Sequence, residues 1–191
     1  IVVDMIRGFL ENPYPLFCGE RSRRIIKPVQ ELLRQEQLKG SKIIYCCDNH
    51  DQDDCEFQMF PHHCVTGSIE SQVIPELSSF QGEVIPKKRF SCFFKTPLAS
   101  RLETLKPDKV ILCGVCTDIC VMFTAADARN YEYVVEVPVD CVASFNEVSH
   151  ALALDHMQKV LGVTLTHQPP EIPYPFLPSP SVISGETADI Y

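Results

Sequence analysis

The sequence predicts an α/β fold, a three-layer α/β/α sandwich built around a mostly parallel central sheet. Two features of residues 1 to 166 support this prediction: short runs of continuous apolar residues, and between them segments whose apolar residues fall three or four positions apart. Strands that are apolar throughout are buried on both faces, which is typical of parallel sheets covered by helices. In such sheets the active site lies beyond the carboxyl ends of the strands.

The individual elements follow in the order that this fold requires. Apolar runs predict strands at 1–4, 41–48, 83–86, 109–114, 133–138 and 163–166. Helical spacing predicts helices from about residue 25 to Gly40, near 69–77, and over 97–105, 117–131 and 145–162. Residues 49–68 show no period, so we expect a long loop, and loops of that length in a compact domain are usually functional. Abundant proline predicts that residues 167–191 form an extended tail outside the domain.

Composition limits the classes of function. A chain of 191 residues is most simply one domain, and its net charge of −8 without a basic block argues against binding to nucleic acid. No apolar run approaches the ~18 residues of a membrane span. Ten cysteines occur in a chain whose core needs no disulfides, so we expect free thiols and a cytoplasmic protein. Because the chain opens at Ile1 inside a strand pattern, we expect a few residues to precede it.

The stretch LCGVCTDICVM, residues 112 to 122, contains three cysteines. Cys113 and Cys116 have the spacing of a zinc, iron–sulfur or redox pair, but no second pair completes a metal site and Cys113 lies within a strand. Packing of all three cysteines in the core is an alternative. With Thr117 as the N-cap, Cys120 falls at the third position of a helix, where free N–H groups and the helix dipole favour a thiolate. We therefore expect Cys120 to be a nucleophile.

A nucleophilic thiol needs a proton acceptor, and no histidine lies at a position that obviously supplies one. The carboxylate of Asp4, at the end of the first strand, can take the thiol proton. A lysine from PKKRFSCF, residues 86 to 93, can stabilise the resulting ion pair.

The long loop contains candidate metal ligands. Asp48 and His50 leave a strand end two positions apart, and His63 returns after a long excursion. Mixed nitrogen and oxygen ligands suit zinc, manganese or iron. The alternative is a solvated acidic loop whose histidines only satisfy hydrogen bonds. The run DNHDQDD lacks the Gly and the bidentate Glu of an EF-hand.

Taken together, VVDMIRGF, KKRFSCF and GVCTDICV resemble the cysteine hydrolases of the isochorismatase-like superfamily over residues 1 to about 166. The resemblance implies the isochorismatase-like fold and a catalytic triad of Asp4 as general base, Lys87, and Cys120 as nucleophile. Lys88 is the alternative lysine. The resemblance also implies a cis peptide before Cys116 and an oxyanion hole formed by the N–H groups of Cys116 and Cys120.

Within that superfamily, D-x-H followed by F-P-x-H-C-V-x-G-S resembles the metal loop of nicotinamidases. This resemblance implies a divalent metal, zinc with manganese or iron as alternatives, bound by Asp48, His50, His63 and Glu56. It implies that His62 is not a ligand. It also implies that a flat substrate ring is bound by aromatic side chains, namely Phe9, Phe60 and Phe90, for which core packing is the alternative reading.

The implied reaction is hydrolysis of nicotinamide to nicotinic acid and ammonia through a cysteine thioester. Another small amide or ureido substrate is the nearest alternative. A non-catalytic scaffold and a redox protein using Cys113 and Cys116 are alternatives from other classes. The expected partner is the small-molecule substrate, without nucleic acid or membrane, and we expect a homo-oligomer.

Overall fold

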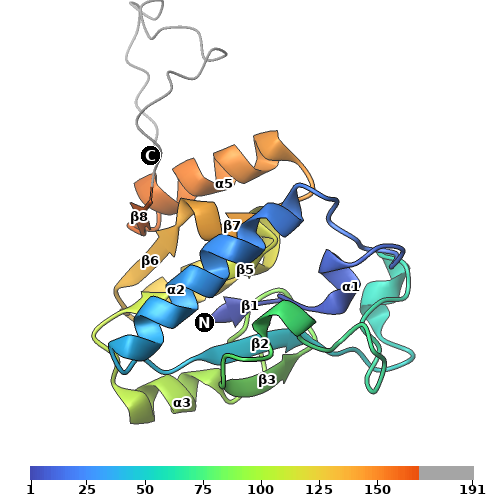
Figure 1. Cartoon of the computed structure of the whole chain (residues 1–191), viewed down its shortest axis with the longest axis horizontal. Coiled ribbons are helices and arrows are strands. Elements are labelled where there is room, and N and C mark those ends of the chain that lie inside the picture. Colours follow the sequence, from blue (N-terminus) through green and yellow to red (C-terminus); the bar gives the residue numbers. More distant parts are fainter. Residues whose placement is uncertain (168–191) are drawn as a thin grey trace, which may run out of the picture.

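The computed structural model describes residues 1–167 (Figure 1), so the expected tail at 167–191 lies outside the described residues except for His167. The strands are β1 (Val2–Val3), β2 (Ile44–Asp48), β3 (Glu83–Lys87), β4 (Val110–Ile111), β5 (Cys113–Val115), β6 (Val135–Pro138), β7 (Val142–Ala143) and β8 (Thr164–Thr166). The α-helices are α1 (Arg7–Leu10), α2 (Ile26–Leu38), α3 (Leu98–Leu105), α4 (Met122–Asn130) and α5 (Glu147–Lys159). None of the helices in the described part of the chain is both long and apolar enough to cross a membrane.

The strands form two hydrogen-bonded sheets, and all neighbouring strands in each sheet are parallel. One sheet has the order β3-β2-β1-β5-β7 and the other the order β4-β6-β8. The single strand expected at 109–114 is divided between them. The N–H of Leu112 donates to Glu136 O of β6, whereas the N–H of Cys113 donates to Ile1 O beside β1. The segment 109–114 therefore changes its hydrogen-bonding partner between Leu112 and Cys113, and it connects the two sheets into one central layer.

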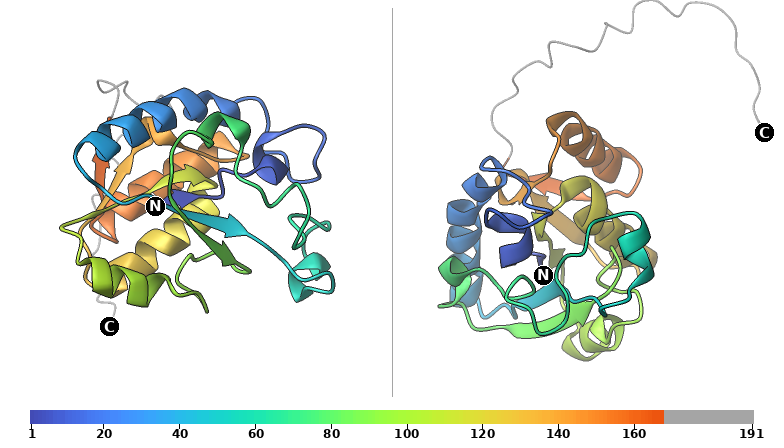
Figure 2. Two further views of the ribbon diagram at one scale, coloured as in Figure 1. Left: turned by 60° about the horizontal axis from the view of Figure 1, so that its bottom comes forward. Right: turned by 90° about the vertical axis from the view of Figure 1, so that its right-hand side faces the viewer.

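Helices cover both faces of the sheet, with α2 on one face and α3, α4 and α5 on the other (Figures 1 and 2). The side chains of β2 alternate accordingly. Tyr45 and Cys47 pack in the core cluster that contains α2, and Ile44 and Cys46 pack in the cluster that contains the other three helices. Because β2 is buried on both sides, its sequence is a continuous apolar run, and the predicted three-layer sandwich is confirmed.

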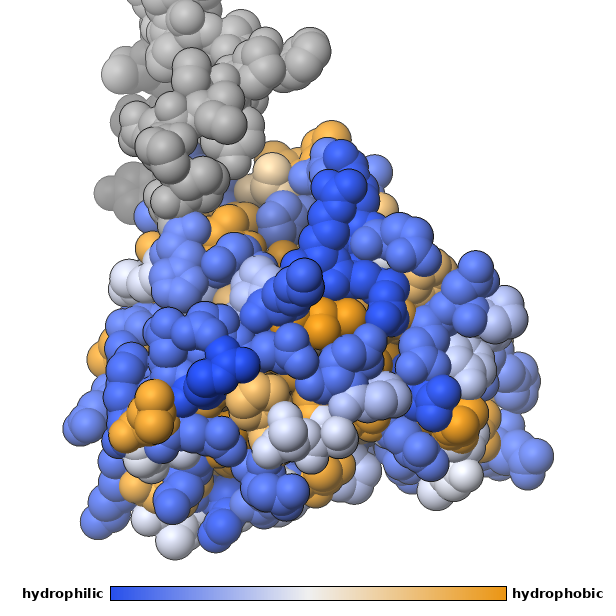
Figure 3. Space-filling model, viewed as in Figure 1, coloured by the Kyte–Doolittle hydropathy of each residue, from blue (hydrophilic) through white to orange (hydrophobic). Residues whose placement is uncertain are grey.

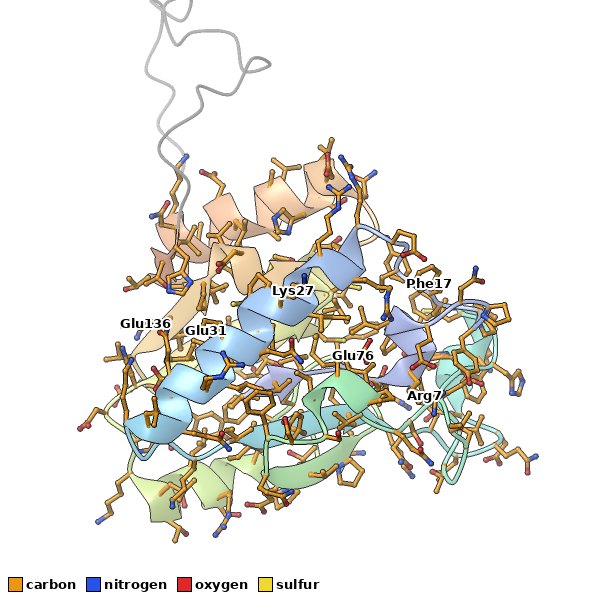
Figure 4. The ribbon with its side chains drawn as sticks, in the orientation of Figure 1. Arg7, Phe17, Lys27, Glu31, Glu76 and Glu136 are labelled. Atoms are coloured by element: carbon orange, nitrogen blue, oxygen red, sulfur yellow. The ribbon has the colours of Figure 1, made fainter. Side chains whose placement is uncertain are left out.

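The pattern of apolar residues in helix α2 determines which of its faces packs against the sheet. Val29, Leu32 and Leu33 are buried against the sheet, and Lys27 and Glu31 lie exposed on the outward face (Figure 4). The surface over this helix is accordingly mostly hydrophilic (Figure 3).

The helix expected near 69–77 is wrong except for its last turn, a 3₁₀ helix at Pro75–Leu77. The preceding residues use their backbone carbonyls elsewhere. Glu70 O and Gln72 O accept hydrogen bonds from the N–H groups of Gly8 and Arg7 at the start of α1. The segment therefore forms a turn at residues 69–72 and an isolated bridge from Val73 to Ile6, and these contacts hold the end of the long loop beside α1.

Candidate active site

Four of the expected site residues meet where parallel strands end. Asp4 follows β1, Asp48 and Lys87 are the last residues of β2 and β3 and lie directly opposite each other, and Cys116 follows β5. The N–H of Asp48 donates to Asp4 Oδ1 at 2.8 Å, which joins the two strand ends. The site therefore lies at the carboxyl edge of the sheet, where the fold class predicted it.

The structure brings the three residues of the expected triad into contact. Lys87 Nζ lies 2.8 Å from Asp4 Oδ2 and donates to Cys120 Sγ at 3.6 Å. It also forms an ion pair with Asp48 Oδ1. The Lys87 side chain is fully buried, whereas the neighbouring Lys88 points to the opposite side and pairs with Asp51 at the surface. The geometry thus favours Lys87 over Lys88.

Burial and charge set the protonation states at this edge. Burial, with the nearby Asp48 carboxylate, raises the pKa of Asp4 to about 7, although Lys87 opposes the shift. Burial would also raise the pKa of Asp48, but the charge of Lys87 and the His50 ring outweigh it and the pKa is lowered. The site therefore contains one carboxyl that exchanges a proton near neutral pH and one that stays ionised.

The thiol of Cys120 does not have the low pKa that a helix N-terminus was expected to give. Burial raises its pKa well above the ordinary value; Lys87 opposes that shift, and the carboxylates of Asp4 and Asp48 add to it. Cys120 is therefore a thiol in the resting site and must lose its proton to a neighbour during any reaction. Asp4 is the acid–base group that titrates near neutral pH in this cluster.

The expected N-cap at Thr117 is also wrong. The helix begins with a π-helical turn at Thr117–Val121, and the residue before that turn is Cys116. The Thr117 hydroxyl is buried and lies 2.8 Å from Nδ1 of His150 in α5, so it is not free to cap the turn. This contact ties the start of the Cys120 helix to α5.

The backbone before Cys120 has the expected unusual geometry. The Val115–Cys116 peptide is cis, and Gly114 has a φ of +118°. A Cβ at Gly114 would lie 1.9 Å from the carbonyl oxygen of Val3, so only glycine allows β5 to approach β1 this closely. The thiol of Cys116 contacts Cys18 at 3.5 Å. All ten cysteines lie in the described residues and all are free.

A pocket opens directly onto these groups. Its apolar lining includes the three expected aromatic residues Phe9, Phe60 and Phe90. Sequence reasoning missed four further apolar lining residues, Leu16, Val115, Ile119 and Phe145. The only sequence signal for Phe145 is an aromatic residue placed just before α5, where it is half exposed. The pocket suits a flat, uncharged ring better than a charged group.

Three of the four candidate metal ligands, Asp48, Glu56 and His63, also line this pocket. Asp48, His50, Glu56 and His63 are all buried, and one donor atom from each lies within 4.8 Å of the others. His50 Nε2 and His63 Nε2 lie 3.6 and 3.9 Å from Asp48 Oδ2. Ligands that are each about 2.1 Å from one ion are at most about 4.2 Å apart. The four distances between an imidazole nitrogen and a carboxylate oxygen in this cluster, 3.6 to 4.0 Å, lie within that limit, so these donors can share a cation.

The hydrogen bonds of the two histidines leave one ring nitrogen of each available to bind a metal ion. The buried Nε2 atom of His50 has no hydrogen-bond partner within residues 1–167. His63 Nδ1 lies 2.8 Å from Pro61 O, which leaves its Nε2 facing the other donors. His62 instead stacks on Phe57, with ring centroids 4.2 Å apart, and takes no part in the cluster. The donor set of two imidazoles and two carboxylates suits zinc, manganese or iron.

Comparison with known proteins places this geometry in a family. The family model described as the isochorismatase domain matches residues 1–169. The chain belongs to the isochorismatase family. An uncharacterized member of this family from Bacillus subtilis, PncA, is 32% identical over 173 residues, which are 85% of this chain and 94% of that protein.

Solved structures agree with this assignment to the isochorismatase family. A pyrazinamidase/nicotinamidase from Streptococcus mutans superposes with a TM-score of 0.82 at 32% identity, covering 86% of this chain and 97% of that one. A pyrazinamidase of Pyrococcus horikoshii in complex with zinc gives a TM-score of 0.80 at 29% identity, covering 87% and 97%. The chain is therefore an amide hydrolase of the isochorismatase family, as the sequence predicted.

Proposed function

We propose that this chain is a metal-dependent nicotinamidase, which hydrolyses nicotinamide to nicotinic acid and ammonia. One observation carries the proposal: a buried Asp–His–Glu–His cluster adjoins the Asp4–Lys87–Cys120 group at one aromatic pocket. The similarity to pyrazinamidases and nicotinamidases supports the same substrate class. Asp48 belongs to both clusters, since one of its oxygens pairs with Lys87 and the other faces the histidines.

The first half of the reaction forms a thioester. Asp4 takes the proton of the Cys120 thiol, and the sulfur attacks the carboxamide carbon. The N–H groups of Cys116 and Cys120 stabilise the oxyanion in this scheme. Asp4 then returns the proton to the nitrogen, the C–N bond breaks, and ammonia leaves. A carboxyl with a pKa near 7 suits this exchange, because both of its protonation states are populated at neutral pH.

The second half returns the free enzyme. Asp4 takes a proton from a water molecule, whose oxygen attacks the thioester carbon. The C–S bond breaks, nicotinic acid is released, and the proton returns to the sulfur of Cys120. Throughout both halves Lys87 compensates the negative charge that moves between Asp4 and Cys120, at distances of 2.8 and 3.6 Å.

Substrate positioning is assigned to the pocket walls. The rings of Phe9, Phe60 and Phe90 hold the flat substrate ring, since all three line the pocket. Asp48, His50, Glu56 and His63 are the residues that would hold the divalent ion. When bound, the ion supplies an electrophilic contact for the ring nitrogen, which orients the carboxamide and withdraws electron density from it.

Ammonia release by the purified chain tests the proposal. We expect turnover of nicotinamide and pyrazinamide, loss of activity after chelation, and recovery when zinc or manganese is added. Benzamide is the matched control, because it keeps the ring and the carboxamide but lacks the ring nitrogen, and it should react poorly. Ammonia from small ureido compounds without ammonia from nicotinamide would contradict the proposal and support the alternative amidase. A homo-oligomer stays a prediction, which light scattering of the same sample tests.

A further inference from the structure

One carboxylate outside the candidate site touches two of its metal ligands. Asp54 follows β2 in the long loop and precedes a 3₁₀ helix at Cys55–Gln58. Its Oδ2 lies 3.2 Å from His50 Nδ1. Its Oδ1 accepts the backbone N–H of Glu56 at 2.9 Å, which caps the short helix that presents the Glu56 side chain. The Asp54 side chain is only 4% exposed, so water competes little for these contacts.

The contact with His50 fixes the state of its ring. A carboxylate can only accept hydrogen bonds, and Asp54 is the carboxylate within hydrogen-bonding distance of the ring, so a neutral ring that makes this contact carries its proton on Nδ1. Nε2 then carries a lone pair. That atom faces Asp48 Oδ2 at 3.6 Å and Glu56 Oε1 at 3.9 Å, and within the described part of the chain it has no hydrogen-bond partner. Asp54 thus holds the His50 lone pair toward the other donors.

Arg89 keeps Asp54 ionised and in place. Its Nη1 donates to both oxygens of Asp54, at 2.9 and 3.1 Å. Burial would raise the pKa of Asp54, but the Glu56 N–H, Arg89 and His50 together hold it well below its usual range. Arg89 Nη1 also lies 3.8 Å from Glu56 Oε2. The guanidinium therefore joins the carboxylate that orients His50 to the carboxylate of a second ligand.

We propose that Asp54, supported by Arg89, is a positioning residue that orients His50 and Glu56 and thereby sets the affinity of the site for its divalent ion. The inference rests on the metal-binding part of the proposed function. Partners that fix the ring of a metal-bound histidine typically change metal affinity by about 10–100-fold. The competing explanation is that Asp54 only caps a helix and pairs with a surface arginine.

Asp54→Asn separates the two explanations, because asparagine has the same size and is an equally good N-cap. If its oxygen accepts the Glu56 N–H, its NH₂ group meets His50 Nδ1 and Arg89. The ring must then move its proton to Nε2, which blocks the lone pair. Asp51→Asn is the matched control on the same loop, since the Asp51 side chain pairs with Lys88 at the surface and, within residues 1–167, forms no hydrogen bond or ion pair with a metal ligand.

The experiment measures zinc affinity of chelator-stripped full-length protein by competition with a chromophoric chelator. It also measures the His50 tautomer by ¹⁵N chemical shifts in zinc-free protein, at a pH where the ring is neutral. We expect Asp54→Asn to bind zinc about 10–100-fold more weakly than wild type and to carry its His50 proton on Nε2. Asp51→Asn should match wild type in both measurements, and the zinc-free melting temperatures of the three proteins should agree.

The outcomes separate the inference from the proposed function. Wild type that binds no zinc would overturn the metal-dependent function, and with it the role of Asp54. Zinc binding by wild type with an unchanged dissociation constant in Asp54→Asn would overturn the inference alone. If Asp54→Asn fails to fold, Arg89→Gln decides, since it keeps both ligand contacts but removes the cation behind them. Weaker zinc binding by folded Arg89→Gln supports the inference, and unchanged binding overturns it.

Discussion

Replacement of Lys87 by methionine should destabilise the fold as well as abolish activity. The Lys87 ammonium is fully buried and pairs with the carboxylates of Asp4, at 2.8 Å, and Asp48. Methionine fills nearly the same volume, so the change removes charge without creating a cavity. Two unit charges 2.8 Å apart attract by about 6 kcal/mol at an effective dielectric constant of about 20, but desolvation offsets part of this. Removal of one partner from a buried ion pair typically costs about 3–5 kcal/mol.

The loss of stability should depend on pH with a definite sign. Lys87 lowers the pKa of both carboxyls. Without it, the pKa of Asp4, already above that of the unfolded chain, rises further, and the pKa of Asp48 rises as well, so the folded variant binds more protons. Its stability should therefore fall as pH rises through those pKa values and recover on acidification. Urea unfolding of chelator-treated protein should show a deficit of about 3–5 kcal/mol at about pH 8 that narrows toward about pH 5.

Lys88→Met is the matched control, one residue along the same strand end. Lys88 pairs with Asp51 at the surface, so its loss should leave unfolding and turnover unchanged. In Lys87→Met the alkylation of Cys120 by iodoacetamide should also titrate at higher pH, because Lys87 opposes the rise in the thiol pKa. The reasoning is refuted if Lys88→Met shows the deficit and Lys87→Met does not, or if the deficit grows on acidification.

Three further predictions concern the sulfur, the base and the strand contact. Cys120→Ser should abolish ammonia release, whereas Cys116→Ala should keep most of it, because the scheme uses only the backbone N–H of Cys116. If an activity assay gave the reverse order, Cys120 would not be the nucleophile. The value of kcat/KM should rise with pH through an apparent pKa near 7 as Asp4 becomes a carboxylate, and a flat profile over that range would exclude Asp4 as the base. Gly114→Ala should prevent folding, since its Cβ would lie 1.9 Å from a β1 carbonyl oxygen, whereas Gly40→Ala, with a φ of +84° but open space, should only lower the melting temperature modestly.

Much of the fold could be predicted because the sheet is parallel and buried on both sides. The central strands β1 and β2 are continuous apolar runs that lead to Asp4 and Asp48, whereas β3, which ends at Lys87, is an edge strand with several exposed residues. The two-residue spacing of Asp48 and His50 at a strand end likewise indicated a ligand cluster, which the structure closes with His63. Local periodicity therefore located the edge of the sheet where the side chains meet.

The protonation state of the cysteine could not be predicted from local sequence. A helix N-terminus favours a thiolate only where it remains near solvent, and Cys120 is buried beneath segments distant in the sequence, so burial dominates its pKa. The role of Thr117 failed for the same reason, because its hydroxyl contacts His150, 33 residues further along. Each error concerns a contact between distant parts of the chain.

The supporting carboxylate was hidden in a run of similar residues. The stretch DNHDQDD offers several aspartates, and nothing in its spacing distinguishes Asp54 from Asp51. The difference arises from the 3₁₀ turn after Asp54 and from Arg89, 35 residues later, which hold one carboxylate inside while Asp51 stays at the surface. A tertiary contact therefore decides which residue supports the ligands.

Direct observation of the acyl-enzyme tests the central claim, that Cys120 attacks the carboxamide of nicotinamide. Protein mixed with excess nicotinamide is quenched in acid during turnover, and the intact mass and the digested peptides are measured. We expect a nicotinoyl group on the peptide that carries Cys116 and Cys120, with fragmentation assigning it to Cys120, and no adduct in Cys120→Ser. A nicotinoyl group on Cys116, or ammonia release by Cys120→Ser at the wild-type rate, would contradict the account.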